Sequence, residues 1–266
     1  MLAGKAKTRA DKPPVAPGET TRDCHSDRRC DSLPKLDEES SLVGMSNLNL
    51  AAFRAAPLQR EPFEYLVLEG FVVPEACGKI NADYPSIEQS GSFPLSQLTY
   101  GPAFKAFTEE LEGEEFRKAF EEKFKLDLSG RPSTITVRGR CSDHDGKIHT
   151  DSKSKIITIL IYMNPNWGDP GGRLRLLRSQ NIEDVLAEVP PKDGTLIAFK
   201  RSENSWHGHK QYAGPRRVIQ FNWVTSEGNQ KLALLRHQIS APVKRLMSIV
   251  RPSRGKQQPT ASADNY

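Results

Sequence analysis

The spacing of apolar residues changes along this chain of 266 residues. The run FEYLVLEGFVV (63–73) predicts a strand that ends in a turn, and Pro74 is suited to the first turn of a helix that reaches about Tyr84. Between Phe104 and Phe124, phenylalanines and one leucine recur at helical spacings, and Gly113 predicts a break between two helices. This part of the chain is therefore predicted to supply helices whose aromatic side chains pack against a sheet.

From residue 134 onward the pattern is that of strands. TITVRGR (134–140) and the runs after it are rich in Ile, Val, Thr, Phe and Trp, and Gly, Pro, Asn and Asp separate them. Helices followed by many short strands predict a mainly β fold, namely a jelly roll of two sheets with a supporting helical layer on one face.

The two ends of the chain lack this patterning. Residues 1–48 are charged, contain several prolines and hold few periodic apolar positions, which is typical of disorder. The apolar pattern begins near Met45, which is therefore a candidate for an alternative start of translation. The net charge of +5 is concentrated in residues 231–266, which hold seven Lys or Arg and one Asp. We therefore expect a disordered leader (1–48), one folded domain (49–238) and a basic, partly disordered tail (239–266).

Composition indicates a cytoplasmic protein. The four cysteines, Cys24, Cys30, Cys77 and Cys141, show no disulfide-framework spacing, and no apolar run reaches the ~18 residues that a membrane span needs. The basic tail has no aromatic residue between positions 239 and 260, which disfavours nucleic acid as a partner.

Two histidines and an aspartate have the spacing of a metal site. His149 and Asp151 are two residues apart, so both side chains point to the same side of an extended backbone; His207 follows 56 residues after Asp151. Two imidazoles and one carboxylate form the facial triad of non-haem Fe(II) oxygenases, which leaves positions open for a co-substrate and O2. Arg216, nine residues after His207, is suited to hold a carboxylate of that co-substrate.

In this order the motifs resemble the 2-oxoglutarate- and Fe(II)-dependent oxygenases, in particular the prolyl-4-hydroxylase-like branch. The resemblance runs from about Phe63 to Val224. It consists of His149-x-Asp151, KIITILIYMN (155–164), GGRLRLL (171–177), GTLIAF (194–199), SWHGH (205–209) and GPRRVIQFNW (214–223). It implies a double-stranded β-helix supported by N-terminal helices.

The resemblance also implies a reaction. Fe(II) held by His149, Asp151 and His207 would act with 2-oxoglutarate, which Arg216 anchors with the hydroxyl of Tyr162 near the same carboxylate. O2 is consumed, succinate and CO2 are formed, and a C–H bond of a second substrate is hydroxylated; ascorbate is an implied accessory. A prolyl residue of a protein is the leading substrate, while other amino-acid residues, free amino acids and saccharide-linked small molecules stay open.

Alternatives remain for individual residues. His209 shares a face with His207, but we expect His207 to be the ligand because it follows Trp206 and has the family's usual distance to Arg216; His209 then lies beside the metal or on the substrate side. His144 is expected to be a polar loop residue that faces solvent or substrate.

The adjacent arginines point to opposite faces of one strand. Arg217 shares its face with Ile219, Phe221 and Trp223, whereas Arg216 shares the more polar face of Val218, Gln220 and Asn222. We therefore expect Arg216 to bind the dicarboxylate, with Arg217 as the alternative.

A second class of function fits the histidines alone. A cupin-like jelly roll that binds metal without O2 chemistry, as an isomerase or a non-catalytic sensor, would keep His149 and His207 but has no need of Arg216.

Overall fold

The computed structural model describes residues 46–228 and 230–231. The expected tail (239–266) and nearly all of the expected leader (1–48) lie outside the described residues. Ser46–Leu48 are described, and they belong to the fold: Leu48 is buried and pairs with Val72. The described domain therefore includes residues just before the expected boundary at 49, and the start at Met45 stays a prediction.

The helices are short, and they come before most of the strands. Their bounds are α1 (Leu50–Ala55), α2 (Pro74–Ala82), α3 (Pro102–Leu111) and α4 (Glu114–Phe124), with a 3-10 turn at Leu95–Gln97. Pro74 and Pro102 occupy the first turns of α2 and α3, where the missing N–H costs no helical hydrogen bond. Gly113 separates α3 from α4, which confirms the predicted break.

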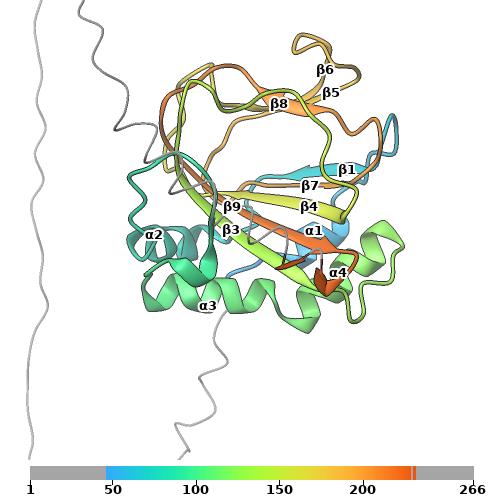
Figure 1. Cartoon of the computed structure of the whole chain (residues 1–266). Coiled ribbons are helices and arrows are strands. Elements are labelled where there is room, and N and C mark those ends of the chain that lie inside the picture. The colour runs from blue at the N-terminus through green and yellow to red at the C-terminus, as the bar shows by residue number, and fades with distance from the viewer. Residues whose placement is uncertain (1–45, 229, 232–266) are drawn as a thin grey trace, which may run out of the picture. The chain divides into compact units, whose positions relative to one another are not determined.

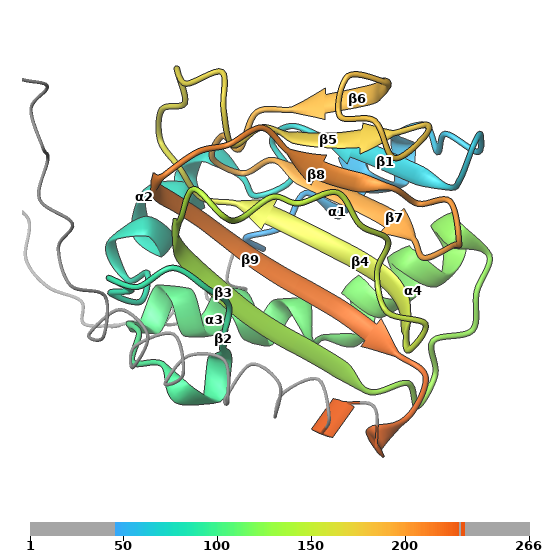
Figure 2. The same ribbon diagram turned by 45° about the horizontal axis from the view of Figure 1, so that its top comes forward.

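The strands form two antiparallel sheets. The strands are β1 (Tyr65–Leu68), β2 (Phe93–Pro94), β3 (Ser133–Cys141), β4 (Lys155–Tyr162), β5 (Leu174–Leu177), β6 (Val185–Val189), β7 (Leu196–Lys200), β8 (His207–His209) and β9 (Gly214–Val224). The large sheet has the order β1-β7-β4-β9-β3-β2, and the small sheet has the order β6-β5-β8. Figures 1 and 2 show the small sheet lying over one face of the large one. The predicted mainly β, double-stranded β-helix fold is confirmed.

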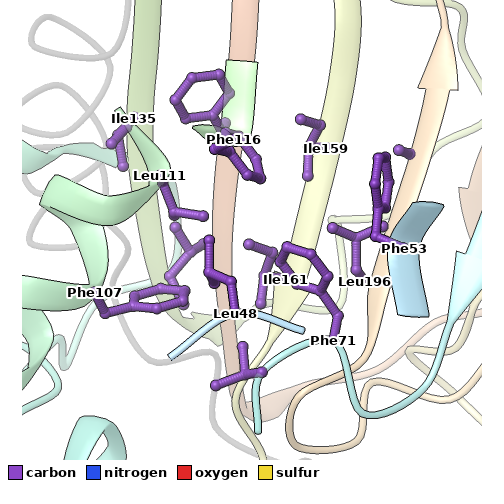
Figure 3. Close-up of a cluster of buried hydrophobic side chains, with 14 of the residues drawn as sticks. Leu48, Phe53, Phe71, Phe107, Leu111, Phe116, Ile135, Ile159, Ile161 and Leu196 are labelled. Carbon is purple, nitrogen blue, oxygen red and sulfur yellow. The ribbon is translucent and has the colours of Figure 1, made fainter. Parts of the chain in front are cut away.

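The helices cover the opposite face of the large sheet (Figure 1). Phenylalanines of α3 and α4 meet aromatic and aliphatic residues of β4 and β9 in one apolar cluster, part of which Figure 3 shows. Phe116 of α4 is 1% exposed, and its ring stacks on Trp223 and contacts Phe221 edge-on. The predicted packing of helical aromatics against a sheet is confirmed, and it makes the large sheet a rigid base for the other face.

A smaller apolar cluster lies between the two sheets at one end. It contains Phe63, Tyr65, Tyr162, Leu174, Leu176, Val189, Ile197, Phe199 and Val218. This cluster packs the two sheets together, and two of its members, Leu174 and Val218, also line a cavity between the sheets. No helix in the described part of the chain is long and apolar enough to cross a membrane.

Candidate metal centre and adjoining cavity

The two histidines of the predicted triad are joined through their backbones. His149 and His207 exchange N–H···O hydrogen bonds of 3.0 Å in both directions, which adds the segment at His149 to the edge of the small sheet beside β8. Asp151 follows two residues later, just before β4 begins. Donor atoms of the three side chains all lie within 4.8 Å of one another. The structure therefore brings together the three residues that the sequence singled out.

Each of these imidazoles has its tautomer set by a backbone carbonyl. His149 Nδ1–H donates to the Lys147 carbonyl at 2.8 Å, and His207 Nδ1–H donates to the Ser205 carbonyl at 3.0 Å. Because a carbonyl only accepts, Nδ1 carries a proton in both rings, which leaves Nε2 as the ring nitrogen that can bind a metal. Burial, together with the nearby His149, lowers the pKa of His207 to about 4, although Asp151 opposes this shift. His207 is therefore neutral near pH 7, the state in which an imidazole binds a metal.

The carboxylate of Asp151 is buried but remains ionised. Burial alone would raise its pKa, yet the ammonium of Lys155, His207 and the Thr158 hydroxyl lower it to about 2. Lys155 Nζ donates to Oδ1 at 2.6 Å, and Thr158 Oγ1 donates to Oδ2 at 2.5 Å. Two imidazoles and one ionised carboxylate on one side of a cavity match the donor set for Fe(II). The residues therefore fit the implied ion.

Sequence reasoning missed Lys155 and Thr158. They follow Asp151 by four and seven residues, across the turn into β4, so only the folded backbone brings their donors to its carboxylate. Nothing in the run SKSKIIT distinguishes them from ordinary residues at a strand start.

A cavity of about 650 Å³ opens between the sheets beside these three residues. Its lining includes Arg216 on β9, which is only 4% exposed. Arg216 Nε donates to the Gly172 carbonyl at 2.8 Å, and one Nη donates to the Tyr162 hydroxyl at 3.4 Å, so the plane of the guanidinium is fixed. Gly172 has a φ of +67°, which favours glycine in this turn.

No carboxylate pairs with Arg216 within the described part of the chain. A buried charge without a counter-ion is costly, because desolvation is not repaid by an ion pair. An anion in the cavity would supply the missing partner, and a carboxylate can bind a guanidinium through two parallel hydrogen bonds.

Arg217 lies on the other face of the sheet. Its Nη1 donates to the backbone and side-chain oxygens of Asn81 on α2, at 3.1 and 3.0 Å, and its guanidinium lies 5.0 Å from the ring centroid of Tyr84. It does not line the cavity. The two arginines are therefore arranged as the alternation of strand side chains predicted.

The remaining sequence candidates have different positions. Tyr162 is fully buried and does not line the cavity. Its ring packs against the guanidinium of Arg216. His209 lines the cavity but is not among the three clustered metal-binding side chains. His144 is exposed next to Asp143 and lies outside the lining.

Known proteins resemble this chain both in a family sequence model and in solved structures. Residues 136–225 match the family model of the 2OG-Fe(II) oxygenase superfamily, and this segment contains His149, Asp151, His207 and Arg216. The match confirms the family resemblance of the sequence motifs. No curated protein matches the chain.

Several solved structures are similar to parts of this one. A prolyl-4-hydroxylase from Pseudomonas putida is 16% identical, with a TM-score of 0.47, and the match covers 67% of this chain and 94% of that one. A viral collagen prolyl hydroxylase from Paramecium Bursaria Chlorella virus-1 is 17% identical, with a TM-score of 0.43 over 60% and 96% of the chains. A prolyl hydroxylase from Trichoplax adhaerens is 15% identical, with a TM-score of 0.41 over 60% and 83%.

Proposed function

We propose that the chain is a hydroxylase that consumes 2-oxoglutarate and O2 at a single Fe(II) and forms succinate and CO2, and the match of residues 136–225 to the 2OG-Fe(II) oxygenase family model supports this proposal. The observation that carries this proposal is Arg216, which is buried without a carboxylate partner among the described residues and lines the cavity that also holds the His149–Asp151–His207 cluster. The family resemblance makes a prolyl or another amino-acid residue one substrate class to test, with ascorbate as an accessory and the cytoplasm as the location.

His149, Asp151 and His207 would hold the ion, through two Nε2 atoms and one carboxylate oxygen. When bound, Fe(II) and 2-oxoglutarate supply the oxidising chemistry, and the chain supplies orientation and charge. Thr158 keeps the carboxylate of Asp151 in position through Oδ2, and the carbonyls of Lys147 and Ser205 orient the rings.

Arg216 would bind the carboxylate of 2-oxoglutarate that is farther from the metal. Its contacts with Gly172 and Tyr162 hold the guanidinium in one plane before the ligand arrives, so little side-chain entropy is lost on binding. A cupin-like isomerase or sensor would bind metal through the same cluster, but its function would not require a buried guanidinium that binds a carboxylate.

The test is anaerobic loading of the purified protein with Fe(II) and 2-oxoglutarate. We expect the weak visible charge-transfer band of the chelate, and we expect O2 to discharge the band with release of succinate, slowly even without a second substrate. His149→Ala removes the band, while His144→Ala, at an exposed histidine outside the cavity, keeps it. A protein that binds iron but never binds 2-oxoglutarate would instead be a metal-binding jelly roll without oxygenase activity.

A further inference from the structure

The floor of the cavity next to the metal cluster is polar and is not used by the proposed co-substrate anchor. Three neighbouring strands of the large sheet contribute Thr158 (β4), Asn222 (β9) and Thr134 (β3), and these residues lie side by side in the strand registers. Since Thr158 also donates to Asp151, this row begins at the metal cluster and crosses the sheet away from it. Gln220, two residues before Asn222, lines the cavity as well.

These side chains hold one another in place. Asn222 Nδ2 donates to Thr134 Oγ1 at 3.1 Å, and Gln220 Nε2 donates to Asn222 Oδ1 at 3.3 Å. Each primary amide has two N–H donors, and each hydroxyl can both donate and accept. One N–H of Asn222, the Oε1 atom of Gln220 and the hydroxyl proton of Thr134 have no partner among the described residues. The row therefore offers both donors and acceptors to a molecule in the cavity.

The charged side chains around this row have other partners. Lys155 pairs with Asp151, and Arg138 donates to Ser92 at 2.7 Å and lies 3.6 Å from Asp145. Lys153, at the exposed rim, lies 3.7 Å from Glu203. With Arg216 assigned to 2-oxoglutarate and Lys153 largely exposed at the rim, the described lining offers no buried, unpaired cation to an anionic second substrate.

The lining is also poor in surfaces for an apolar ring. Its apolar members in the described chain are Leu160, Leu174, Val218 and Val224, and it includes no Phe, Tyr or Trp. A prolyl ring presents methylene groups and no N–H, so it would leave the amides and hydroxyls of the floor without partners, which is unfavourable in a buried site.

We propose that Thr134, Gln220 and Asn222 bind the second substrate, and that this substrate is an uncharged molecule with hydroxyl groups next to the C–H bond that is oxidised. A hydroxyl group both donates and accepts, so it matches the mixed donors and acceptors of the row. The hydroxyls can belong to a sugar ring or to a seryl or threonyl side chain. This inference rests on the proposed function, because it takes the metal cluster as the reacting centre.

The experiment measures succinate release by the Fe(II)-loaded protein in the presence of three sets of probes. Methyl glycosides form the first set, capped seryl and threonyl amides the second, and capped prolyl amides the third. We expect a hydroxyl-bearing set to raise the rate above the rate without probe, and the set that acts identifies the source of the hydroxyls. Stimulation by the prolyl set to an equal or greater extent, or by no set, overturns the proposal.

Substitution of the row gives a second readout. We expect Asn222→Leu to raise the KM for the active hydroxyl probe about tenfold, which corresponds to about 1.4 kcal/mol, with a smaller change in kcat, because the substitution removes hydrogen bonds to the probe. Asn166→Leu, the same change at an exposed residue outside this cavity, is the control and should keep the KM. An unchanged KM in Asn222→Leu would also contradict the proposal.

The visible band of the chelate distinguishes a failure of the proposed function from a failure of the proposed substrate class. If the wild-type protein forms no band with Fe(II) and 2-oxoglutarate, the proposed function itself fails. If the band forms and succinate is released but hydroxyl probes have no effect, only the substrate class is wrong.

Discussion

Arg216 and Arg217 are neighbours on β9, but they lie on opposite faces of the large sheet in very different surroundings. Arg217 faces the helices, where Asn81 accepts its hydrogen bonds and the ring of Tyr84 packs against it. Arg216 faces the small sheet, is more deeply buried and has no carboxylate partner among the described residues. Arg217 has its hydrogen-bond acceptors within the fold, whereas Arg216 lines the cavity and is the residue that we propose binds a ligand.

The same contrast extends to the two faces as a whole. The helix-side face is a packed cluster of aromatic and aliphatic side chains, and the other face combines a small apolar cluster with an open polar cavity. Because the helix-side cluster stabilises the sheet, the other face can keep buried polar groups that contribute little to stability. We therefore expect substitutions on the two faces to change different properties, namely stability on one and ligand binding on the other.

The largest effect is expected at the metal cluster. Asp151→Ala removes the only carboxylate of the cluster and leaves Lys155 facing the ion, so metal affinity should fall by more than about 100-fold, beyond the 10–100-fold typical of outer-shell changes. Isothermal titration with Co(II) or Fe(II) measures this affinity. Asp143→Ala, at an exposed loop residue, should bind as the wild type does. Equal affinities in both variants would show that the ion binds elsewhere.

On the helix-side face, Phe116→Ala should lower the free energy of unfolding by about 3–5 kcal/mol, because it removes a buried ring that packs on Trp223 and Phe221. Chemical denaturation followed by circular dichroism measures the change. The metal affinity of the folded variant should stay within about threefold of the wild type. A large loss of affinity with little loss of stability would contradict the separation of the two faces.

The two arginines give a direct comparison. Arg216→Ala should weaken 2-oxoglutarate binding by roughly 2–5 kcal/mol, which is more than about 30-fold, whereas Arg217→Ala should leave this affinity nearly unchanged. Arg217→Ala should instead lower the free energy of unfolding by about 1–3 kcal/mol, since it leaves the oxygens of Asn81 without their donor. Titration of 2-oxoglutarate into each metal-loaded variant measures this affinity. A larger loss of affinity in Arg217→Ala than in Arg216→Ala would mean that Arg217 binds the carboxylate.

A smaller effect is expected from Lys155→Met. The substitution removes an ammonium that lies 2.6 Å from Oδ1 of Asp151 and competes with a metal ion for that oxygen, while Thr158 still holds Oδ2. Metal affinity should therefore rise by roughly threefold to tenfold, as expected for removal of one like charge in a partly solvated site. Competition with a fluorescent chelator measures the change. A fall in affinity would mean that Lys155 is needed mainly to orient the carboxylate.

The smallest effect is expected at the N-terminus. A chain that begins at Met45 should unfold at the same denaturant concentration as the full chain and bind metal equally well, because residues 1–44 lack the periodic apolar positions that would join either face. Parallel denaturation curves test this, and a lower midpoint for the shortened chain would place part of the leader in the fold.

The sequence by itself determined the elements and the residue types of the site. Periodic phenylalanines, a glycine break and β-rich runs predicted the helices and strands, and the two-residue spacings of His149 with Asp151 and of Arg216 with Val218 predicted which side chains share a face. These are local properties, since the repeat of a helix or strand decides which residues lie together.

Only the tertiary structure decided which distant groups meet. The family resemblance implied that His149 and His207 share one ion and that Tyr162 lies near Arg216, but local spacing encodes neither contact. The donors that Lys155 and Thr158 give to Asp151 were not expected at all, because they depend on the turn into β4. The polar row of Thr134, Asn222 and Thr158 likewise exists only because β3, β9 and β4 are neighbours in that order. Neighbouring strands are chosen by packing of the whole sheet against the helices, so this part of the site follows from the fold.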